Sequence, residues 1–423
     1  MQRHSRRSLL RASGAAAVAG LASLAGCDAV ATVGLPEAPE RGPAFPADPT
    51  GATSTFRGGL ARRGYYPEHD TPAAPAAAWS RPVNTGDHTA AKASAVPLYP
   101  GRSTGEAAGV VVPGDDGRVR AFDAAGDRLW AAAVEPAERG VHGTPTVAGD
   151  TVYVGAYDGA LYALDRATGE RRWRVRLGDA VGSSPAYHDG RVYLAVEFAP
   201  YEGSLFAVDA RTGVVEAEAP APTDHPHSTP ALAPAADRVV VGANDGDVYG
   251  FTLDLDRDRS WEVHTDGAVK GPVAVHDGAA FVGSWDRHLY RIDLRTGTVA
   301  WRHATGGKVM SGPAVDPRRG VVYVGSHDRR VHAVGVDGEP AWRSGTGGWI
   351  TGCPSVVGDR VLVGSYDGHL YALDPESGDT FGDRAWSLEL DGWVTASPRP
   401  VGDAVYVAER ATETGPGAVY AVT

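Results

Sequence analysis

The sequence is poor in cysteine and lysine. Its two cysteines, Cys27 and Cys353, allow at most one disulfide, which excludes a disulfide-stabilised scaffold. Lysine occurs only at positions 92, 270 and 308, and the formal net charge is −12. An acidic chain without a basic face is not expected to bind nucleic acid. With its many alanines, this composition is typical of a salt-adapted protein from a GC-rich genome.

Helical periodicity is missing as well. No segment repeats its apolar residues every 3.6 positions, so we expect almost no helix. The 423 residues instead include 55 Gly and 30 Pro, which is typical of many short strands joined by turns. This length allows two or three ordinary domains or one large repeat architecture.

Residues 1–26 predict a cleaved export signal, in which a basic head precedes an apolar run that is too short for a good spanning helix. Arg6 and Arg7 resemble the pair of a twin-arginine signal, and the Leu-Ala-Gly-Cys that ends at Cys27 resembles a lipobox. We therefore expect Cys27 to be lipidated and to anchor the protein to the outer face of the cytoplasmic membrane. The alternative is an ordinary cleaved signal with an incidental cysteine.

Residues 27–55 carry the lipidated cysteine and a stretch rich in Pro, Ala and acidic residues. This stretch has no periodic apolar face, so it predicts a flexible linker between the lipid and the folded domain.

Eight similar units fill residues 56–423. Each combines a short apolar run, a Gly turn, a V-Y-V-G stretch, an Asp-Gly type of turn, an L-Y-A-L-D stretch and a Thr-Gly turn. Four short apolar stretches per unit, repeated every 40 to 48 residues, predict the four-stranded blades of a propeller. The prolines that open the units are Pro97, Pro145, Pro185, Pro230, Pro272, Pro313, Pro354 and Pro398.

The last unit stops at Thr423 after three strands, and a matching fourth strand with its tryptophan occurs at residues 78–83. We therefore predict an all-β, eight-bladed propeller of four-stranded antiparallel blades, in which this N-terminal strand completes the last blade. Such closure leaves no exposed edge strand. The repeated turn aspartates, which are Asp158, Asp245, Asp286, Asp328 and Asp367, are assigned to turn chemistry.

The frame A-L-D-x-x-T-G-x-x-x-W at residues 163–173 resembles the repeat of quinoprotein (PQQ-like) propellers. F-R-G-G-L-A-R-R-G at residues 56–64 resembles the segment that opens many exported members of that family. The family also includes the bacterial outer-membrane assembly lipoprotein and exported PQQ-repeat proteins of salt-adapted archaea. The resemblance implies that one tryptophan per blade docks against the next blade, namely Trp79, Trp130, Trp173, Trp261, Trp301, Trp342 and Trp386.

The resemblance extends to quinone-dependent alcohol and glucose dehydrogenases, which stack the quinone on a disulfide between adjacent cysteines and bind calcium through Glu and Asn. This sequence has no adjacent cysteines. We therefore expect no cofactor, no catalytic residue and a non-catalytic binding or assembly scaffold. The alternative is a PQQ-dependent dehydrogenase of alcohols or sugars, with PQQ and calcium. His225 and His227 resemble a metal pair, but without a nearby carboxylate we predict a polar loop and no metal site.

Binding is expected at the mouth of the central channel, where loops before the blade prolines and turns after the second strands should lie on one face. Trp285, Trp349 and Trp393 fall outside the docking phase and favour a recognition patch, although aromatic packing over the blade tops is the alternative. Two lysines here favour an anionic or carbohydrate-like ligand. Other exported proteins are also expected partners, and a monomer is expected. The candidate residues are His142, Tyr157, His227, Lys270, Trp285, Lys308, Met310, His327, Trp349, Tyr366 and Trp393.

Overall fold

The computed structural model describes residues 36–51, 53–85, 93–99, 109–134, 140–380, 385–413 and 415–423. Arg6, Arg7 and Cys27 lie outside these residues. The described helices are three short 3-10 turns, η1 (Phe56–Gly58), η2 (Pro234–Ala236) and η3 (Arg257–Arg259). Among the described residues, no helix is long and apolar enough to cross a membrane.

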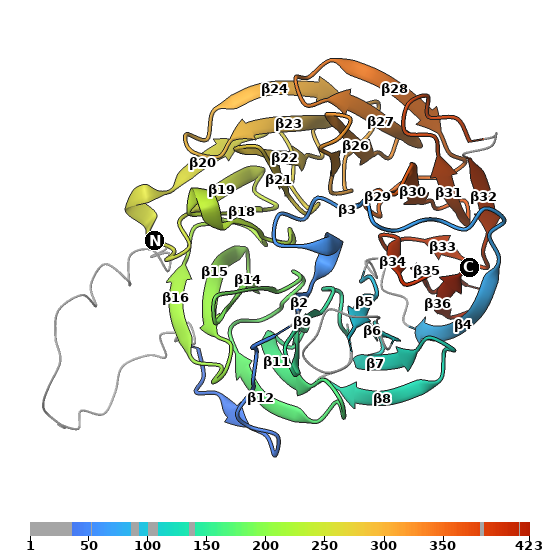
Figure 1. The fold of residues 1–423 in the computed structure, drawn as a ribbon. Coiled ribbons are helices and arrows are strands. Elements are labelled where there is room, and N and C mark those ends of the chain that lie inside the picture. The colour runs from blue at the N-terminus through green and yellow to red at the C-terminus, as the bar shows by residue number, and fades with distance from the viewer. Residues whose placement is uncertain are drawn as a thin grey trace, which may run out of the picture.

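Eight sheets, each built on a four-stranded antiparallel blade, surround a central channel (Figure 1). From the channel outward, blade 1 contains β5 (Val96–Leu98), β6 (Gly109–Pro113), β7 (Arg118–Asp123) and β8 (Arg128–Ala133); blade 2 contains β9 (Thr146–Ala148), β10 (Thr151–Gly155), β11 (Ala160–Asp165) and β12 (Arg171–Arg176); blade 3 contains β13 (Ala186–His188), β14 (Arg191–Phe198), β15 (Glu202–Asp209) and β16 (Val215–Ala219); and blade 4 contains β17 (Ala231–Ala233), β18 (Arg238–Gly242), β19 (Asp247–Phe251) and β20 (Trp261–His264).

The second half of the ring repeats the pattern. Blade 5 contains β21 (Ala274–His276), β22 (Ala279–Gly283), β23 (His288–Asp293) and β24 (Val299–Ala304); blade 6 contains β25 (Ala314–Asp316), β26 (Val321–Gly325), β27 (Arg330–Gly335) and β28 (Pro340–Gly345); blade 7 contains β29 (Ser355–Val357), β30 (Arg360–Gly364), β31 (His369–Leu373) and β32 (Trp386–Glu389); and blade 8 contains β34 (Arg399–Val401), β35 (Ala404–Arg410), β36 (Gly417–Val422) and β4 (Ala77–Asn84). A short strand, β33 (Trp393–Val394), also pairs with β35.

The two parts of the chain that close the ring meet in blade 8. β4 pairs antiparallel with β36, and Trp79 lies opposite Ala421. Val83 is fully buried in the cluster between blades 8 and 1, where Trp79 also packs. The predicted eight-bladed, all-β propeller and its closure by the N-terminal strand are confirmed.

The docking tryptophans pack on a glycine in the outer turn of the next blade. Trp261, for example, lies against Gly297 and donates its indole N–H to the carbonyl of Leu294 at 2.8 Å. These glycines have positive φ, which a residue without a side chain adopts readily. The missing Cβ also leaves room for the tryptophan ring. The pairs are Trp79–Gly126, Trp130–Gly169, Trp173–Gly213, Trp261–Gly297, Trp301–Gly338 and Trp342–Gly378. Trp386 instead packs on the strands of blade 8, which has no such turn because its outer strand is β4.

Gly297→Ala tests this docking contact. Gly297 has φ +72°, and a Cβ there would lie 2.9 Å from the Trp261 ring. Gly278→Ala is the matched control, because its φ is +67° and a Cβ would meet nothing within 4 Å. Both substitutions strain the backbone, so the difference between them isolates the docking contact. We expect Gly297→Ala to lower the free energy of unfolding by about 1–3 kcal/mol more than Gly278→Ala, measured in urea. Equal losses would show that the contact contributes nothing.

The turn aspartates hold their own hairpins. In each of these turns a carboxylate oxygen accepts the backbone N–H two residues later, as Asp286 does from His288 at 2.9 Å. A tyrosine hydroxyl four residues on donates to the same side chain in four of these blades. The assignment to turn chemistry is therefore confirmed.

One end of the channel is closed by residues 53–66, drawn in blue across the centre of the ring (Figure 1). This segment, called here the plug, includes β2 (Thr53–Ser54), η1 and β3 (Tyr65–Tyr66). β2 pairs with β9 of blade 2, and β3 pairs in parallel with β29 of blade 7. Between them, the carbonyls of Leu60, Ala61 and Arg63 accept N–H groups from the inner strands of blades 4, 5 and 6.

Two buried arginines fix the plug to the blade prolines. Arg62, fully buried, donates from Nη2 to the carbonyl of Pro185 at 2.9 Å and from Nε to that of Pro230 at 3.2 Å. Arg57 donates in the same way to the carbonyls of Pro313 and Pro354. Burial, followed by the charge of Arg57, lowers the pKa of Arg62 to about 9. The guanidinium therefore remains charged at neutral pH, and its cost of burial is offset by the carbonyls that surround it.

The linker prediction is wrong for the described part of residues 27–55. β1 (Glu40–Arg41) pairs with β12 at the outside of blade 2, and β2 pairs with β9 at the inside. The segment between β1 and β2, called here the crossing segment, is joined to the blade by Arg172, which donates to the carbonyl of Pro46 at 2.7 Å. Composition suggested a flexible tether, but short backbone pairing needs no apolar period and leaves no such signal in the sequence.

Candidate functional site

Two sets of loops meet at the channel end opposite the plug. We call the second residue after the repeated V-Y-V-G stretch the mouth position. In blades 2–7, the residue at this position donates its backbone N–H to a carbonyl in the loop that precedes an inner strand. The pairs are Tyr157 to Gly140, Glu197 to Ala180, Asn244 to His225, Trp285 to Ala268, His327 to Lys308, and Tyr366 to Trp349. The turns after the second strands and the loops before the inner strands therefore lie on one face, as the repeat pattern predicted.

A pocket opens between these loops into the channel. His142, His227 and Met310 line it, as do Thr351 and Thr395 of blades 7 and 8. Phe56 of the plug lines the same pocket, so the plug supplies its floor. The site is therefore a cup rather than a through-going pore.

Two stacked pairs of rings lie side by side at the mouth, joined by a tilted contact. We call them the aromatic arc, which comprises His327, Trp349, Tyr366 and Trp393. Centroids of His327 and Trp349 lie 5.0 Å apart with planes at 3°, and those of Tyr366 and Trp393 lie 5.4 Å apart. Trp349 bridges the pairs at 6.1 Å from Tyr366. Trp349 and Trp393 nevertheless remain 51% and 36% exposed. The rings pack on one another while presenting apolar surface to solvent.

Two lysines cover the remaining out-of-phase tryptophan. Nζ of Lys270 lies 4.5 Å, and Nζ of Lys308 4.0 Å, from the ring centroid of Trp285. Both contacts are within cation–π range. Burial, opposed by Asp224 and Glu197, lowers the pKa of Lys270. Two cations beside one ring form a positive spot on an acidic molecule, and we name it the lysine–tryptophan cluster.

His142 and Tyr157 form a separate pair on blade 2, with ring centroids 4.5 Å apart. The mouth of the cup is thus divided into chemically different parts, and the predicted residues do not all form one patch.

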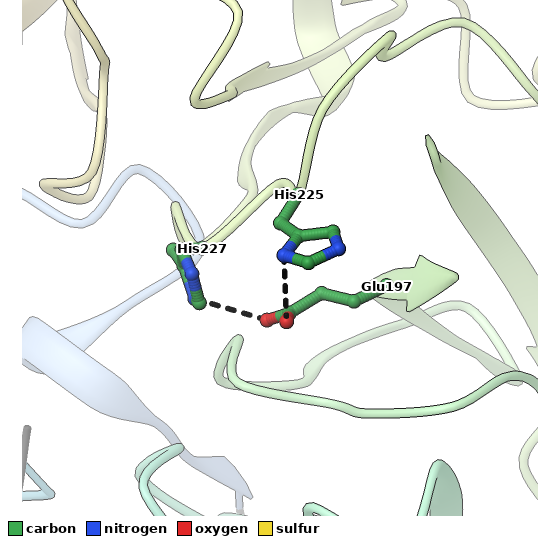
Figure 2. Close-up of side chains that lie close together, drawn as sticks. All are labelled: Glu197, His225 and His227. Carbon is green, nitrogen blue, oxygen red and sulfur yellow. Dashed lines mark ion pairs between the residues drawn. The ribbon is translucent and has the colours of Figure 1, made fainter. Parts of the chain in front are cut away.

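Between blades 3 and 4, a carboxylate joins the two histidines of the His-Pro-His loop (Figure 2). Nδ1 of His227 lies 2.9 Å from Oε1 of Glu197, and Nδ1 of His225 lies 3.7 Å from Oε2. Burial raises the pKa of Glu197, but contact with His227 and the nearby positive charges outweigh it, so the pKa lies below its ordinary value. Our expectation that these histidines lack a carboxylate is wrong.

Sequence reasoning missed Glu197 because it lies 28 residues before His225 and on another blade. Its place in the repeat carried the signal. It occupies the mouth position of blade 3, where blades 2 and 7 carry Tyr157 and Tyr366.

Cys353 belongs to a belt of hydrogen bonds that links adjacent blades around the channel. Its Sγ accepts the N–H of Gly312 at 3.1 Å, and its own N–H is donated to Oγ of Ser397. The same pattern joins Ser94 to Thr144, Thr144 to Ser184, Ser184 to Thr229, and Ser397 to Ser94. A buried thiol in this place packs and accepts a hydrogen bond between blades.

The family model described as outer membrane protein assembly factor BamB matches residues 115–259, 256–317 and 286–422. The chain belongs to this family. Its membership agrees with the PQQ-like repeat and the eight-bladed fold.

Relatives of this BamB-family chain differ in the names they carry. Serine/threonine-protein kinase AfsK of Streptomyces griseus is 34% identical over 62% of this chain, but the match spans only 33% of the kinase. BamB of Escherichia coli K12 is 25% identical over 72% of this chain and 79% of its own length. Among solved structures, quinohemoprotein alcohol dehydrogenase of Comamonas testosteroni is similar with a TM-score of 0.68 at 16% identity, over 87% of this chain and 80% of its own. This structural likeness shows the fold alone.

Proposed function

We propose that this protein is an exported, lipid-anchored propeller that acts as a non-catalytic binding or assembly scaffold at the outer face of the cytoplasmic membrane. The observation that carries the proposal is the aromatic arc, which leaves two large rings exposed at the open end of a cup. Exposed, stacked aromatics are typical of recognition surfaces. The match to a family described as an assembly factor supports protein partners.

The arc and the lysine–tryptophan cluster suit different parts of one ligand. Flat rings favour the apolar face of a sugar or an aromatic side chain, and the paired lysines favour an anionic group. An exported protein or a carbohydrate-like ligand with negative charge fits both.

Trp349→Ala combined with Trp393→Ala is expected to remove most of the retained partners when the tagged protein is captured from host membranes and its partners are quantified by mass spectrometry. We expect at least a tenfold loss, because each truncation removes a ring that is one-third to one-half exposed. The melting temperature should change by only a few degrees. Leu129→Ala is the control, since Leu129 is 51% exposed on β8 of blade 1. Unchanged partners in the double variant would contradict the proposed site.

Cys27→Ala is expected to release the folded propeller into the medium, because the lipid on this cysteine is the proposed attachment to the membrane. Immunoblots of membrane and medium fractions measure the distribution. Arg6→Lys with Arg7→Lys should instead retain precursor inside the cell. Cys27→Ala protein still held in membranes would overturn the lipid anchor without touching the proposed binding role.

Quinone-dependent oxidation is the second candidate. One observation favours it: Glu197 and Asn244 occupy the mouth positions of adjacent blades, and each has a buried side-chain oxygen without a hydrogen-bond partner. The residues do not otherwise fit the quinone, because the adjacent-cysteine disulfide has no counterpart and Cys353 belongs to the inter-blade belt. A quinone that stays with the protein through dialysis would favour the dehydrogenase over the scaffold.

A further inference from the structure

We propose that Glu197, His225 and His227 form a binding site for a divalent transition-metal ion of the zinc type. This inference is independent of the binding role proposed above. It concerns the opposite side of the cup from the aromatic arc, and it assigns a ligand chemistry to residues from two different blades.

The three side chains already have the spacing of a ligand set. Their candidate atoms, two imidazole nitrogens and a carboxylate oxygen, lie within 4.8 Å of one another. With zinc–ligand bonds of about 2.0–2.2 Å, ligand atoms in a tetrahedral site lie about 3.3 Å apart. The observed separations of 2.9 Å and 3.7 Å between the histidine nitrogens and the carboxylate oxygens bracket this value. Figure 2 shows both histidines beside the carboxylate, on one loop.

The carboxylate supplies a second, independent indication of a ligand. The Glu197 side chain is 6% exposed, and its Oε1 has no partner in hydrogen-bond geometry, although Nδ1 of His227 is close. A buried carboxylate oxygen whose nearest donor is poorly aligned is only partly satisfied, and a cation would satisfy it better. A metal bound between Oε1 and the imidazoles would supply that cation.

Gly182 keeps space beside this oxygen. A Cβ at residue 182 would lie 2.9 Å from Oε1 of Glu197, 3.1 Å from the hydroxyl of Tyr157 and 3.3 Å from Nδ1 of His227. The absent side chain therefore leaves a small polar space next to the cluster. Gly182 and His227 also line the channel pocket, so an open coordination position would face the cup.

The donor set selects the class of metal. Calcium and magnesium prefer oxygen ligands throughout, whereas two imidazoles and one carboxylate suit zinc and its first-row neighbours. The charged groups around the cluster act in both directions. Asp224 adds negative charge beside His225, to whose N–H it is bonded, while Lys270 is near enough to influence Glu197. The positive charge of Lys270 therefore partly opposes binding of the cation by the three ligands.

The test uses the full chain with Cys27→Ala, so that the thiol of Cys27 cannot compete for the metal. The protein is first freed of metal with EDTA. Zinc binding is followed by calorimetry and by competition with a chromophoric chelator, and cobalt substitution reports the coordination in its visible spectrum. We expect one zinc per chain and a cobalt spectrum of four- or five-coordinate type. His225→Ala and His227→Ala should each weaken binding by about 100-fold or more. Gly182→Ala, which leaves all three ligands in place, should weaken it as well.

His303→Ala is the matched control, since Nε2 of His303 lies 3.3 Å from Nδ1 of His332 in another histidine pair. It should leave zinc binding unchanged. Glu197→Gln keeps the shape of the side chain, and its melting curve shows whether the fold survives. The site is overturned if wild-type protein binds no zinc, if the two histidine variants bind it as well as the wild type, or if calcium displaces zinc at equal concentration. None of these outcomes depends on partners captured through the aromatic arc.

Discussion

A chain without residues 56–84 is expected to lose more than about 5 kcal/mol of unfolding free energy. The deletion removes β4, with the fully buried Val83 and the partly buried Trp79, and most of the plug. Loss of a fully buried tryptophan costs roughly 3–5 kcal/mol, so Trp79 contributes part of that amount, and the lost strand pairing and plug contacts add the rest. It also exposes the edge of β36, which is an aggregation hazard. Denaturation in guanidinium gives the stability, and size-exclusion chromatography reports association.

The control for this deletion is removal of residues 36–51. That change takes away β1 and the crossing segment but leaves the plug and β4, so we expect a loss of no more than roughly 2 kcal/mol, as for a few surface contacts. Equal stability losses for the two deletions would show that ring closure by β4 contributes little, which would contradict the role given to the β4–β36 pairing.

Arg62→Lys should lower the unfolding free energy by about 3 kcal/mol or more, although the charge is retained. The guanidinium reaches carbonyls of Pro185, Pro230 and Phe56, and Oγ1 of Thr55, from three nitrogens. A single ammonium cannot reach this fork of acceptors. Each buried acceptor left unpaired costs about 1–3 kcal/mol, while the burial cost of the charge persists. Urea denaturation at pH 7 measures the difference.

Arg63→Lys is the control for that substitution. Arg63 is partly exposed, and its backbone carbonyl, which the change does not touch, accepts from Val315. We expect its stability to remain within about 0.5 kcal/mol of the wild type. If Arg62→Lys were equally harmless, the arginine would not be what holds the plug to the blades.

The architecture could be predicted because a propeller repeats one pattern of local signals. The blade prolines, the turn aspartates and the tryptophans each fix the same phase, and the missing fourth strand of the last unit indicated where the chain closes. The segment F-R-G-G-L-A-R-R-G was noticed only as a resemblance. Nothing in its composition showed that Arg57 and Arg62 would be buried among proline carbonyls, because these acceptors come from four blades spread over 170 residues.

The position of the mouth loops was predictable from the repeat, and the contacts among their side chains were predictable only in part. Because register places Tyr157, His327 and Tyr366 at equivalent positions, the residues of the mouth could be named from the repeat. Which side chains meet was not predictable, since several contacts join a turn of one blade to the loop of the next. That geometry holds an ion pair at Glu197, a cation–π contact at Trp285 and a ring stack at His327.

Closure by β4 also has a consequence for the order in which the protein matures. A ribosome makes Trp79 long before Ala421, its eventual neighbour, so β4 waits without a partner until β36 has been synthesised. The plug waits in the same way for the blades that it joins. Local hairpins can form as they emerge, but the ring closes only after β36 has left the ribosome. A stalled or prematurely terminated nascent chain would therefore display an open sheet edge, the form most exposed to quality-control proteases and chaperones.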